Sequence, residues 1–346
     1  MSETELADAD QPQPLEPGLP PEIASPLAPF AGAAPPAPEW FTQVIQHEPE
    51  RARIPVLGAE IELLTWGEVG LPGLIFVHGN TAHADWWSFI APFFARTHRV
   101  AALSVSGMGG SDWRAAYSFE TFASEIHAAA QAAGLYASGK APVYIGHSFG
   151  GAQVYFSAAR HPERMSACLL VDSGFGGPPS AQERERLDRE AIAAGRAPNH
   201  WREPRGGPHR VYPTLEMALT RFRFMPPQVP GNLYIADFIA RRSLKRAPMS
   251  EGKEEGWTWK FDPALWSKLD RSGWERPATS VSVPLVHIYG DRSAIISRYA
   301  SAGGMPDPLG PDIPRIIIPD SEHHVMVDQP LALVSALRAV LAMWRL

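Results

Sequence analysis

A serine flanked by glycines is the first feature of this sequence that could do chemistry. The residues Gly146, His147, Ser148, Phe149 and Gly150 follow an apolar run and precede a helical pattern. Glycines on both sides allow a sharp strand-to-helix turn that exposes the hydroxyl, and the free N–H groups of the helix favour negative charge there. We therefore predict that Ser148 is a nucleophile. An incidental serine in a glycine-rich turn is the alternative.

A serine hydroxyl is a poor nucleophile until a base removes its proton. His323 and His324 lie after a late apolar run and before the last helical stretch, so either could supply that base. A carboxylate should orient the imidazole and stabilise its charged form. Asp172 and Asp291 each end an apolar run, and either completes the order serine, aspartate, histidine. The residues alone leave both choices open.

Such a reaction also needs two backbone donors for the negative charge that develops on the substrate oxygen. We expect one to be the amide of Phe149, directly after the nucleophile, and the other to be the amide of Asn80. Asn80 follows the apolar run Gly73–Val77 in the loop His78, Gly79, Asn80. The side chain of Asn80 has a competing role, which is to cap the following turn.

Short apolar runs alternate with helical stretches along most of the chain, which predicts the elements that position these residues. Strands are expected at Glu60–Thr65, Gly73–Val77, Arg99–Val105, Pro142–Gly146, Ala167–Val171, Pro284–Tyr289 and Pro314–Ile318. Helices are expected at Phe119–Ala133, Gly150–Arg160 and Leu331–Trp344. The alternation is typical of the α/β class, with a mostly parallel central sheet flanked by helices.

One long stretch breaks this alternation and should be an inserted helical subdomain. We predict a helical lid at residues 176–274, with helices at Ala181–Ala194 and Leu233–Lys245, and a core at 39–175 and 275–346. The lid is rich in arginine, which favours either an anionic substrate or a solvated surface. Its aromatic residues line an apolar pocket or pack the lid on the core, and the predicted substrate-binding residues are Trp86, Trp87, Phe222 and Trp257.

Composition and charge limit the function classes. Residues 1–38 are acidic, proline-rich and free of lysine and arginine, so we predict a disordered tail. The chain holds 31 Lys and Arg against 37 Asp and Glu, which argues against a nucleic-acid partner. Its one cysteine, Cys168, excludes an intrachain disulfide framework and multi-cysteine metal sites. No apolar run has the length of a membrane span, and no secretory signal is visible, so we expect a cytoplasmic protein without a membrane partner.

These motifs together resemble the α/β-hydrolase superfamily over about residues 55–346. The elbow around Ser148 is complete, and the loop from His78 to Asn80 resembles the family's oxyanion motif. The turn Ser106–Ser111 resembles the turn after the family's fourth strand, with Ser104 where aspartate is usual. A late family pattern places the histidine seven residues before a proline. His323 precedes Pro330 by seven, with Glu322 where glycine is common, so the resemblance favours His323 as the base and makes His324 a packing neighbour.

The resemblance also bears on the acid and on the reaction. The family usually carries its acid at the position of Ser293, but some members carry it after the sixth strand, which corresponds to Asp172. We therefore favour Asp172 and keep Asp291 as the alternative acid. A serine elbow differs from the aspartate elbow of haloalkane dehalogenases and epoxide hydrolases.

The reaction that this resemblance implies is hydrolysis of carboxylic esters through an acyl-enzyme, without an organic cofactor or metal. Three alternatives use the same triad: a C–C bond hydrolase, a lactonase and a perhydrolase. A catalytically inactive binding protein of this fold is a fourth. The expected partner is a small-molecule ester substrate, and a homodimer is an assembly that the sequence leaves open.

Overall fold

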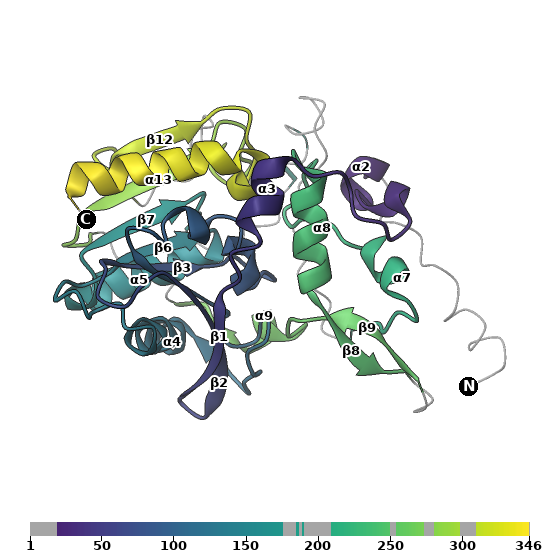
Figure 1. The fold of residues 1–346 in the computed structure, drawn as a ribbon, viewed down its shortest axis with the longest axis horizontal. Helices are drawn as coiled ribbons and strands as arrows, with labels where there is room; N and C mark the ends of the chain where they lie inside the picture. Colours follow the sequence, from purple (N-terminus) through teal and green to yellow (C-terminus); the bar gives the residue numbers. More distant parts are fainter. Residues whose placement is uncertain are drawn as a thin grey trace.

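The computed structural model describes residues 19–175, 185–186, 189, 209–249, 254–272, 280–297 and 309–345. An eight-stranded sheet forms its centre, with the strand order β1-β2-β4-β3-β6-β7-β11-β12 (Figure 1). Its strands are β1 (Glu50–Val56), β2 (Ala59–Trp66), β3 (Gly73–Val77), β4 (Arg99–Leu103), β6 (Val143–His147), β7 (Ala167–Val171), β11 (Leu285–Gly290) and β12 (Arg315–Ile318). Only β2 runs antiparallel to its neighbours; the other adjacent pairs are parallel.

The middle strands form where the sequence is continuously apolar. Every residue of β3, β4, β6 and β7 is buried, as expected for parallel strands with helices on both faces. Alternate residues of these strands point to opposite faces of the sheet. Ile75 packs with α4 (Phe119–Ala132) and α5 (Phe149–Arg160), whereas Phe76 packs with α13 (Pro330–Trp344). The predicted α/β sheet is therefore confirmed, and the predicted strands and helices of the core match within one or two residues.

Strand β1 was not predicted, and the reason is its position at the sheet edge. Its first four residues are exposed, and only Val56 is fully buried, so the strand carries no apolar run. It also contains Pro55, which cannot donate a ladder hydrogen bond and is tolerated at an edge. The antiparallel pairing with β2 covers all seven residues of β1.

Part of the long insertion is described, as residues 209–249 and 254–272. It contains α7 (Leu215–Leu219), α8 (Leu233–Arg242), the antiparallel hairpin β8 (Leu244–Pro248) and β9 (Glu255–Trp259), and α9 (Leu265–Lys268). A short strand β10 (Leu269–Asp270) pairs with β5 (Tyr117–Ser118) of the core. Figure 1 shows α8 beside the sheet and the hairpin projecting away from it. The predicted helix Ala181–Ala194 lies almost entirely outside the described residues.

The predicted helix Leu233–Lys245 was too long. Helix α8 ends at Arg242, and the chain then enters β8, because Leu244–Pro248 forms five registered pairs with β9. Its buried residues, including Ile235 and Ile239, belong to the same apolar cluster as Phe76 of the sheet. This part of the insertion is thus continuous with the core.

The N-terminal stretch differs from the expectation over residues 19–38, where the structure shows a short helix α2 (Pro21–Ala24) and a 3-10 turn at Ala28–Phe30. Ala24 and Leu27 are buried, and Arg241 of α8 donates a hydrogen bond to the carbonyl of Gly32 at 2.6 Å. Apolar residues among the prolines therefore fix this stretch against the insertion. Residues 1–18 lie outside the described range. A search of the described residues finds no helix with the length and apolarity that a membrane crossing requires.

Candidate active site

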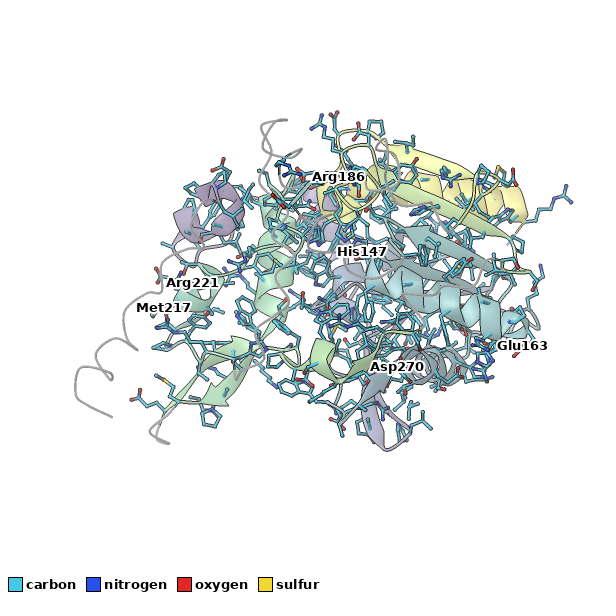
Figure 2. The ribbon with its side chains drawn as sticks, turned by 180° about the vertical axis from the view of Figure 1, so that it is seen from behind. His147, Glu163, Arg186, Met217, Arg221 and Asp270 are labelled. Carbon is cyan, nitrogen blue, oxygen red and sulfur yellow. The ribbon has the colours of Figure 1, made fainter. Side chains whose placement is uncertain are left out.

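Ser148 lies on a tight bend between β6, which ends at His147, and α5, which begins at Phe149. Its backbone has φ 54° and ψ −120°, a conformation that costs a non-glycine residue about 1–3 kcal/mol. The flanking glycine Gly150 is required sterically, since a Cβ there would clash with the carbonyls of Val77 and His78. Figure 2 shows His147 near the middle of the molecule, while Met217 and Arg221 of the insertion lie toward its far end. The hydroxyl of Ser148 therefore lies at the end of β6, where α5 begins.

His323 joins Ser148 to Asp172. Its Nε2 is 2.9 Å from the Ser148 Oγ, and its Nδ1 is 2.8 Å from the Asp172 Oδ1. Asp172 is fully buried and can only accept, so the imidazole donates through Nδ1 and presents its Nε2 lone pair to the serine hydroxyl. The side chains named as nucleophile, base and favoured acid thus meet in one hydrogen-bonded row, drawn from positions separated by up to 175 residues.

Asp172 is held in place by backbone and side-chain donors from β11 and the turn after it. The amide of Gly290 donates to Oδ2 at 2.9 Å, and the hydroxyl of Ser293 donates to Oδ1 at 2.6 Å. The alternative acid, Asp291, lies elsewhere: its Oδ1 accepts the amide of Ser321 at 3.1 Å. The structure therefore brings Asp172 to His323 and uses Asp291 in a turn.

Sequence reasoning missed the role of Ser293 at this site. The signal was present in the resemblance, because Ser293 occupies the position at which the family usually carries its acid. The hydroxyl there contacts the same carboxylate oxygen as His323. The residue at the family's usual acid position thus donates a hydrogen bond to the carboxylate of Asp172.

Two further histidines surround His323. The ring centroids of His147 and His324 lie 4.8 and 4.9 Å from its own. Burial lowers the pKa of both well below the usual value of a histidine, and the neighbouring His323 adds to that effect. Both rings are therefore neutral near pH 7. His147 donates from Nε2 to the carbonyl of His323 at 3.0 Å, which fixes the backbone of the base itself.

The loop after β3 lies directly against Ser148. A Cβ at Gly79 would be 3.2 Å from the Cβ of Ser148, a tight contact that glycine avoids. His78 holds the loop, because its Nε2 accepts the amide of Val105 at 3.1 Å and its Nδ1 donates to the carbonyl of Gly79 at 2.7 Å. Burial lowers the pKa of His78 to about 4, which keeps it neutral. Asn80 is the next residue of this loop.

The four predicted substrate-binding aromatics lie in different surroundings. Trp86 is beside the site, with its ring centroid 5.5 Å from that of His324 and 5.8 Å from that of Phe224. Phe222 is one ring further away and packs edge-on against Phe224 at 5.0 Å. Phe224 is one of the aromatic residues of the insertion but was not among the four predicted substrate-binding residues. Trp86 and Phe224 thus form an aromatic wall on the side of His324.

The surroundings of Trp87 and Trp257 indicate that these residues have structural roles. Trp87 is fully buried and its ring lies 4.8 Å from that of Phe76 in the sheet. Trp257 lies on β9 under the guanidinium of Arg246, 4.2 Å from the ring centroid. Among the contacts of the described residues, neither ring touches the side chain of Ser148, His323 or Asp172. Trp266, which was not among the four, packs against Phe149 at 5.2 Å.

The arginines of the insertion that the structure describes are largely engaged in structural contacts. Arg241 pairs with Asp237 at 2.8 Å, and Arg242 lies 3.6 Å from the ring centroid of Phe238. These contacts favour a structural role for the described arginines over recognition of an anionic substrate.

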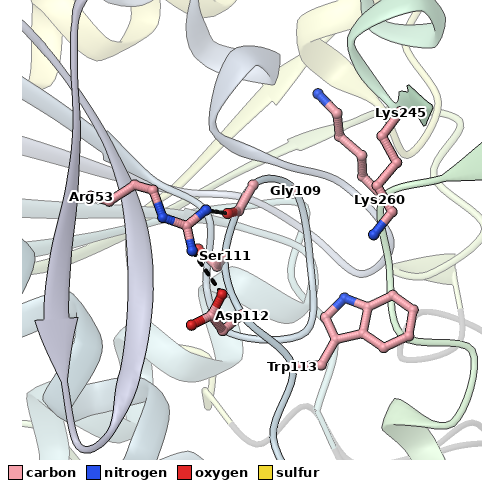
Figure 3. Close-up of a pocket in the computed structure, with 8 residues that line it drawn as sticks. Arg53, Gly109, Ser111, Asp112, Trp113, Lys245 and Lys260 are labelled. Carbon is pink, nitrogen blue, oxygen red and sulfur yellow. Dashed lines mark hydrogen bonds and ion pairs between the residues drawn. The ribbon is translucent and has the colours of Figure 1, made fainter. Parts of the chain in front are cut away.

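A cavity of about 470 Å³ opens between β1, the turn at residues 109–113 and the β8–β9 hairpin (Figure 3). Arg53 at its edge pairs with Asp112 at 2.7 Å, and Lys245 lies 4.9 Å from the ring centroid of Trp113. The residues that line it include no member of the Ser148 row. The cavity is therefore separate from the candidate active site. Within the described ranges, no group of three or more His, Cys, Asp or Glu side chains has the arrangement of a metal site.

Comparisons with known proteins agree with this geometry. A family model described as the alpha/beta hydrolase family matches residues 74–337. Lipase LipV of Mycobacterium tuberculosis is 31% identical over 114 residues, which are 33% of this chain and 41% of the lipase. This chain is thus aligned with less than half of that relative.

Solved structures show the same fold at low identity. A hypothetical protein from Pseudomonas aeruginosa PAO1 is 22% identical, with a TM-score of 0.62 over 86% of this chain and 100% of that one. A thioesterase domain from the curacin biosynthetic pathway is 20% identical, with a TM-score of 0.60 over 83% of this chain and 98% of the domain. At these identities the likeness concerns the fold alone.

Proposed function

Because this chain belongs to the α/β-hydrolase family, we propose that it is a serine hydrolase that cleaves carboxylic esters through an acyl-enzyme. The observation that carries the proposal is the single row in which His323 contacts Ser148 at 2.9 Å and Asp172 at 2.8 Å. A serine at the elbow favours acyl transfer, since its hydroxyl adds to a carbonyl carbon. The partial similarity to a lipase supports the same class of bond.

The proposed reaction begins when Ser148 Oγ attacks the ester carbonyl and its proton passes to Nε2 of His323. Asp172 stabilises the imidazolium that forms, through the hydrogen bond from Nδ1. The carbonyl oxygen becomes an oxyanion, which the amides of Phe149 and Asn80 are proposed to bind. The positive end of α5, which starts at Phe149, adds to that stabilisation.

Collapse of this intermediate breaks the ester C–O bond. His323 gives its proton to the leaving alkoxide, which departs as the alcohol, and the acyl group stays on Ser148. A water molecule then donates a proton to His323 as its oxygen attacks the acyl carbon. The second tetrahedral intermediate releases the carboxylic acid, and the proton on His323 returns to Ser148 Oγ.

The proposed substrate is a small or medium organic ester. Trp86 and Phe224 supply an apolar wall beside the base, which suits an uncharged acyl or alcohol group. The same triad would serve a C–C bond hydrolase, a lactonase or a perhydrolase. A panel of p-nitrophenyl esters, lactones and diketones separates these activities. We expect the highest kcat/KM on the esters.

A serine-directed fluorophosphonate probe tests the proposal directly. Wild-type protein should be labelled at Ser148, and Ser148→Ala should not. Ser335→Ala is the matched control, because this serine lies exposed on α13, where its hydroxyl only contacts the carbonyl of Leu331. If the folded wild-type protein is not labelled, the proposal fails. The remaining interpretation is then a catalytically inactive binding protein of this fold.

A further inference from the structure

A buried glutamine of the insertion reaches the loop that carries the proposed base. Gln228 lies between α7 and α8, and only 2% of its surface is exposed. Its Oε1 accepts the backbone amide of His324 at 2.9 Å and the ring Nδ1 of His324 at 2.6 Å. Its Nε2 lies 3.1 and 3.0 Å from the two carboxylate oxygens of Asp328.

Chemistry fixes the orientation of this amide. Asp328 also accepts the backbone amides of Gly231 at 3.0 Å and Glu322 at 2.8 Å, so its carboxylate is surrounded by donors. The NH₂ group of Gln228 must therefore face Asp328, and its carbonyl must face His324. His324 in turn carries its proton on Nδ1.

The contacts lie on both sides of His323. Asp328 holds the amide of Glu322, one residue before the base, and Gln228 holds the amide of His324, one residue after it. His147 holds the carbonyl of His323 itself. Three consecutive backbone units are thus fixed by side chains from three separate segments: the elbow, the insertion and the turn before α13.

We infer that Gln228 is a positioning residue, which sets the backbone of the His323 loop from the insertion so that Nε2 meets the hydroxyl of Ser148. This inference rests on the proposed function. Displacement of a catalytic group by about 1 Å can reduce the rate by about 100-fold. The amide links the insertion to the catalytic loop through hydrogen bonds that bridge 96 and 100 residues.

A purely structural role for Gln228 would lower the thermal stability of the protein and leave the activity of the folded fraction unchanged. A positioning role changes kcat, with KM nearly constant, and makes kcat depend on the charge that faces Asp328. The variant Gln228→Glu separates the two, because it has the same shape. It keeps the oxygen that accepts both hydrogen bonds from His324 but replaces the NH₂ group that donates to Asp328 with an oxygen about 3 Å from a carboxylate.

Two carboxyl groups this close share a proton, so one of them ionises only at raised pH. The kcat of Gln228→Glu divided by that of the wild type should therefore fall by about 10- to 100-fold between pH 6 and pH 9, as the second charge appears. Dividing by the wild type removes the pH dependence that both proteins share. Gln43→Glu is the matched control, since the exposed Gln43 also donates to a carboxylate, that of Glu39, at 2.7 Å.

The double variant Gln228→Glu with Asp328→Asn restores a hydrogen bond between positions 228 and 328. The asparagine NH₂ is now the donor and the glutamate carboxylate is the acceptor. The kcat of the double variant should exceed that of either single variant, and its ratio to the wild type should no longer depend on pH. With asparagine at position 328, the backbone amide of Gly231 or of Glu322 faces the NH₂ group and loses its acceptor, so recovery to within about threefold is expected rather than full recovery. A double variant no better than the singles, or a pH-independent ratio for Gln228→Glu, overturns the inference.

The labelling of the wild type at Ser148 keeps this test apart from that of the proposed function. Without labelling, the proposed function fails. With labelling, and with the same pH profile and labelling rate in Gln228→Glu as in the wild type, the proposed function stands and the positioning role of Gln228 fails. Melting temperatures of all variants, measured alongside, give the folded fraction by which each kcat is corrected.

Discussion

Replacing Asp172 by asparagine should almost abolish turnover while the site keeps its shape. Both oxygens of Asp172 accept hydrogen bonds: Oδ2 from the amide of Gly290, and Oδ1 from Ser293 and His323. The backbone amide of Gly290 cannot become an acceptor, so the asparagine must turn its NH₂ group toward Ser293 and His323. The imidazole then accepts at Nδ1 and carries its proton on Nε2, where it cannot take the proton of Ser148.

The size of this effect follows from the charge that is lost. A carboxylate and an imidazolium about 4 Å apart attract each other by about 4 kcal/mol at an effective dielectric constant of about 20. That corresponds to a factor of about 1,000 in rate, and the wrong tautomer adds to it. We expect kcat of Asp172→Asn to fall by about 1,000- to 10,000-fold with little change in KM, measured on a p-nitrophenyl ester under saturating substrate.

Asp291→Asn is the matched control for this experiment. The carboxylate of Asp291 accepts only the amide of Ser321 among the contacts described, and an asparagine carbonyl can accept the same bond. Its kcat should stay within about threefold of the wild type. If Asp172→Asn keeps more than a tenth of the wild-type kcat, or if Asp291→Asn is the variant that loses activity, the assignment of the acid is wrong.

The same geometry predicts that the acid can be moved. Ser293 Oγ lies 2.6 Å from the Asp172 oxygen that contacts His323, so a carboxylate at 293 extends into the place of that oxygen. Glycine suits position 172, because φ is 46° there. The double variant Asp172→Gly with Ser293→Asp should be at least about tenfold more active than Asp172→Gly alone. Equal activities would show that the second backbone position cannot present an acid to His323.

Three further outcomes follow from contacts described above. Ser293→Ala removes a hydrogen bond to a charged acceptor and should lower kcat by about tenfold at constant KM in the ester assay; an unchanged kcat would contradict a role for this hydroxyl. Gly150→Ala should destabilise the fold by about 2 kcal/mol or more in urea unfolding, since its Cβ meets the carbonyl of Val77 at 2.6 Å. The free energy of unfolding should fall from about pH 6.5 toward pH 4, by up to about 3 kcal/mol each for His78 and His83, because burial lowers their folded pKa to about 4 and the unfolded chain binds the extra protons. Glu125 and Asp328, whose pKa burial raises, act in the opposite direction, so the histidine contribution is measured as the difference between the wild type and His78→Gln. The same pH dependence in both proteins would refute the neutral-histidine account.

The central strands could be predicted because their sequence carries the whole signal. A strand such as β3 is buried on both faces, so every one of its residues is apolar and the run is bounded by glycine and polar residues. The edge strand β1 and the hairpin β8–β9 are exposed and carry no such run. Their existence depends on pairing with a neighbour, which local sequence does not encode.

The elbow motif and the family resemblance indicated Ser148 and His323, whose side chains the structure brings together, but the choice of acid could not be made from the residues alone. Asp172 and Asp291 both follow buried strands at the same edge of the sheet. The difference lies in the backbone: the positive φ of Asp172, together with donors from Gly290 and Ser293, turns its carboxylate toward His323. These donors lie more than 100 residues away in sequence, so only the fold relates them to the acid.

Ser104 shows how a departure from a family pattern is compensated. The resemblance places an aspartate where this chain has Ser104. The Ser104 hydroxyl accepts the amide of Ala84 at 3.0 Å and donates to Glu62 Oε2 at 2.6 Å. Glu62, on β2, also accepts the amide of Gly110 at 2.9 Å. The carboxylate that holds this turn therefore comes from a neighbouring strand, at a position that no local motif indicates.

The cluster of imidazoles around the proposed base is compatible with catalysis only if His323 alone becomes charged. A proton on His147 or His324 would place a second cation about 5 Å from the imidazolium and oppose its formation. Burial prevents this, because it lowers the pKa of both neighbours and leaves them neutral donors, one to the carbonyl of His323 and one to Gln228. Of these three rings, His323 is the one in contact with a carboxylate, that of Asp172, so the proton of Ser148 has a single favourable destination. The neighbouring rings can then fix the backbone of the base without competing for its charge.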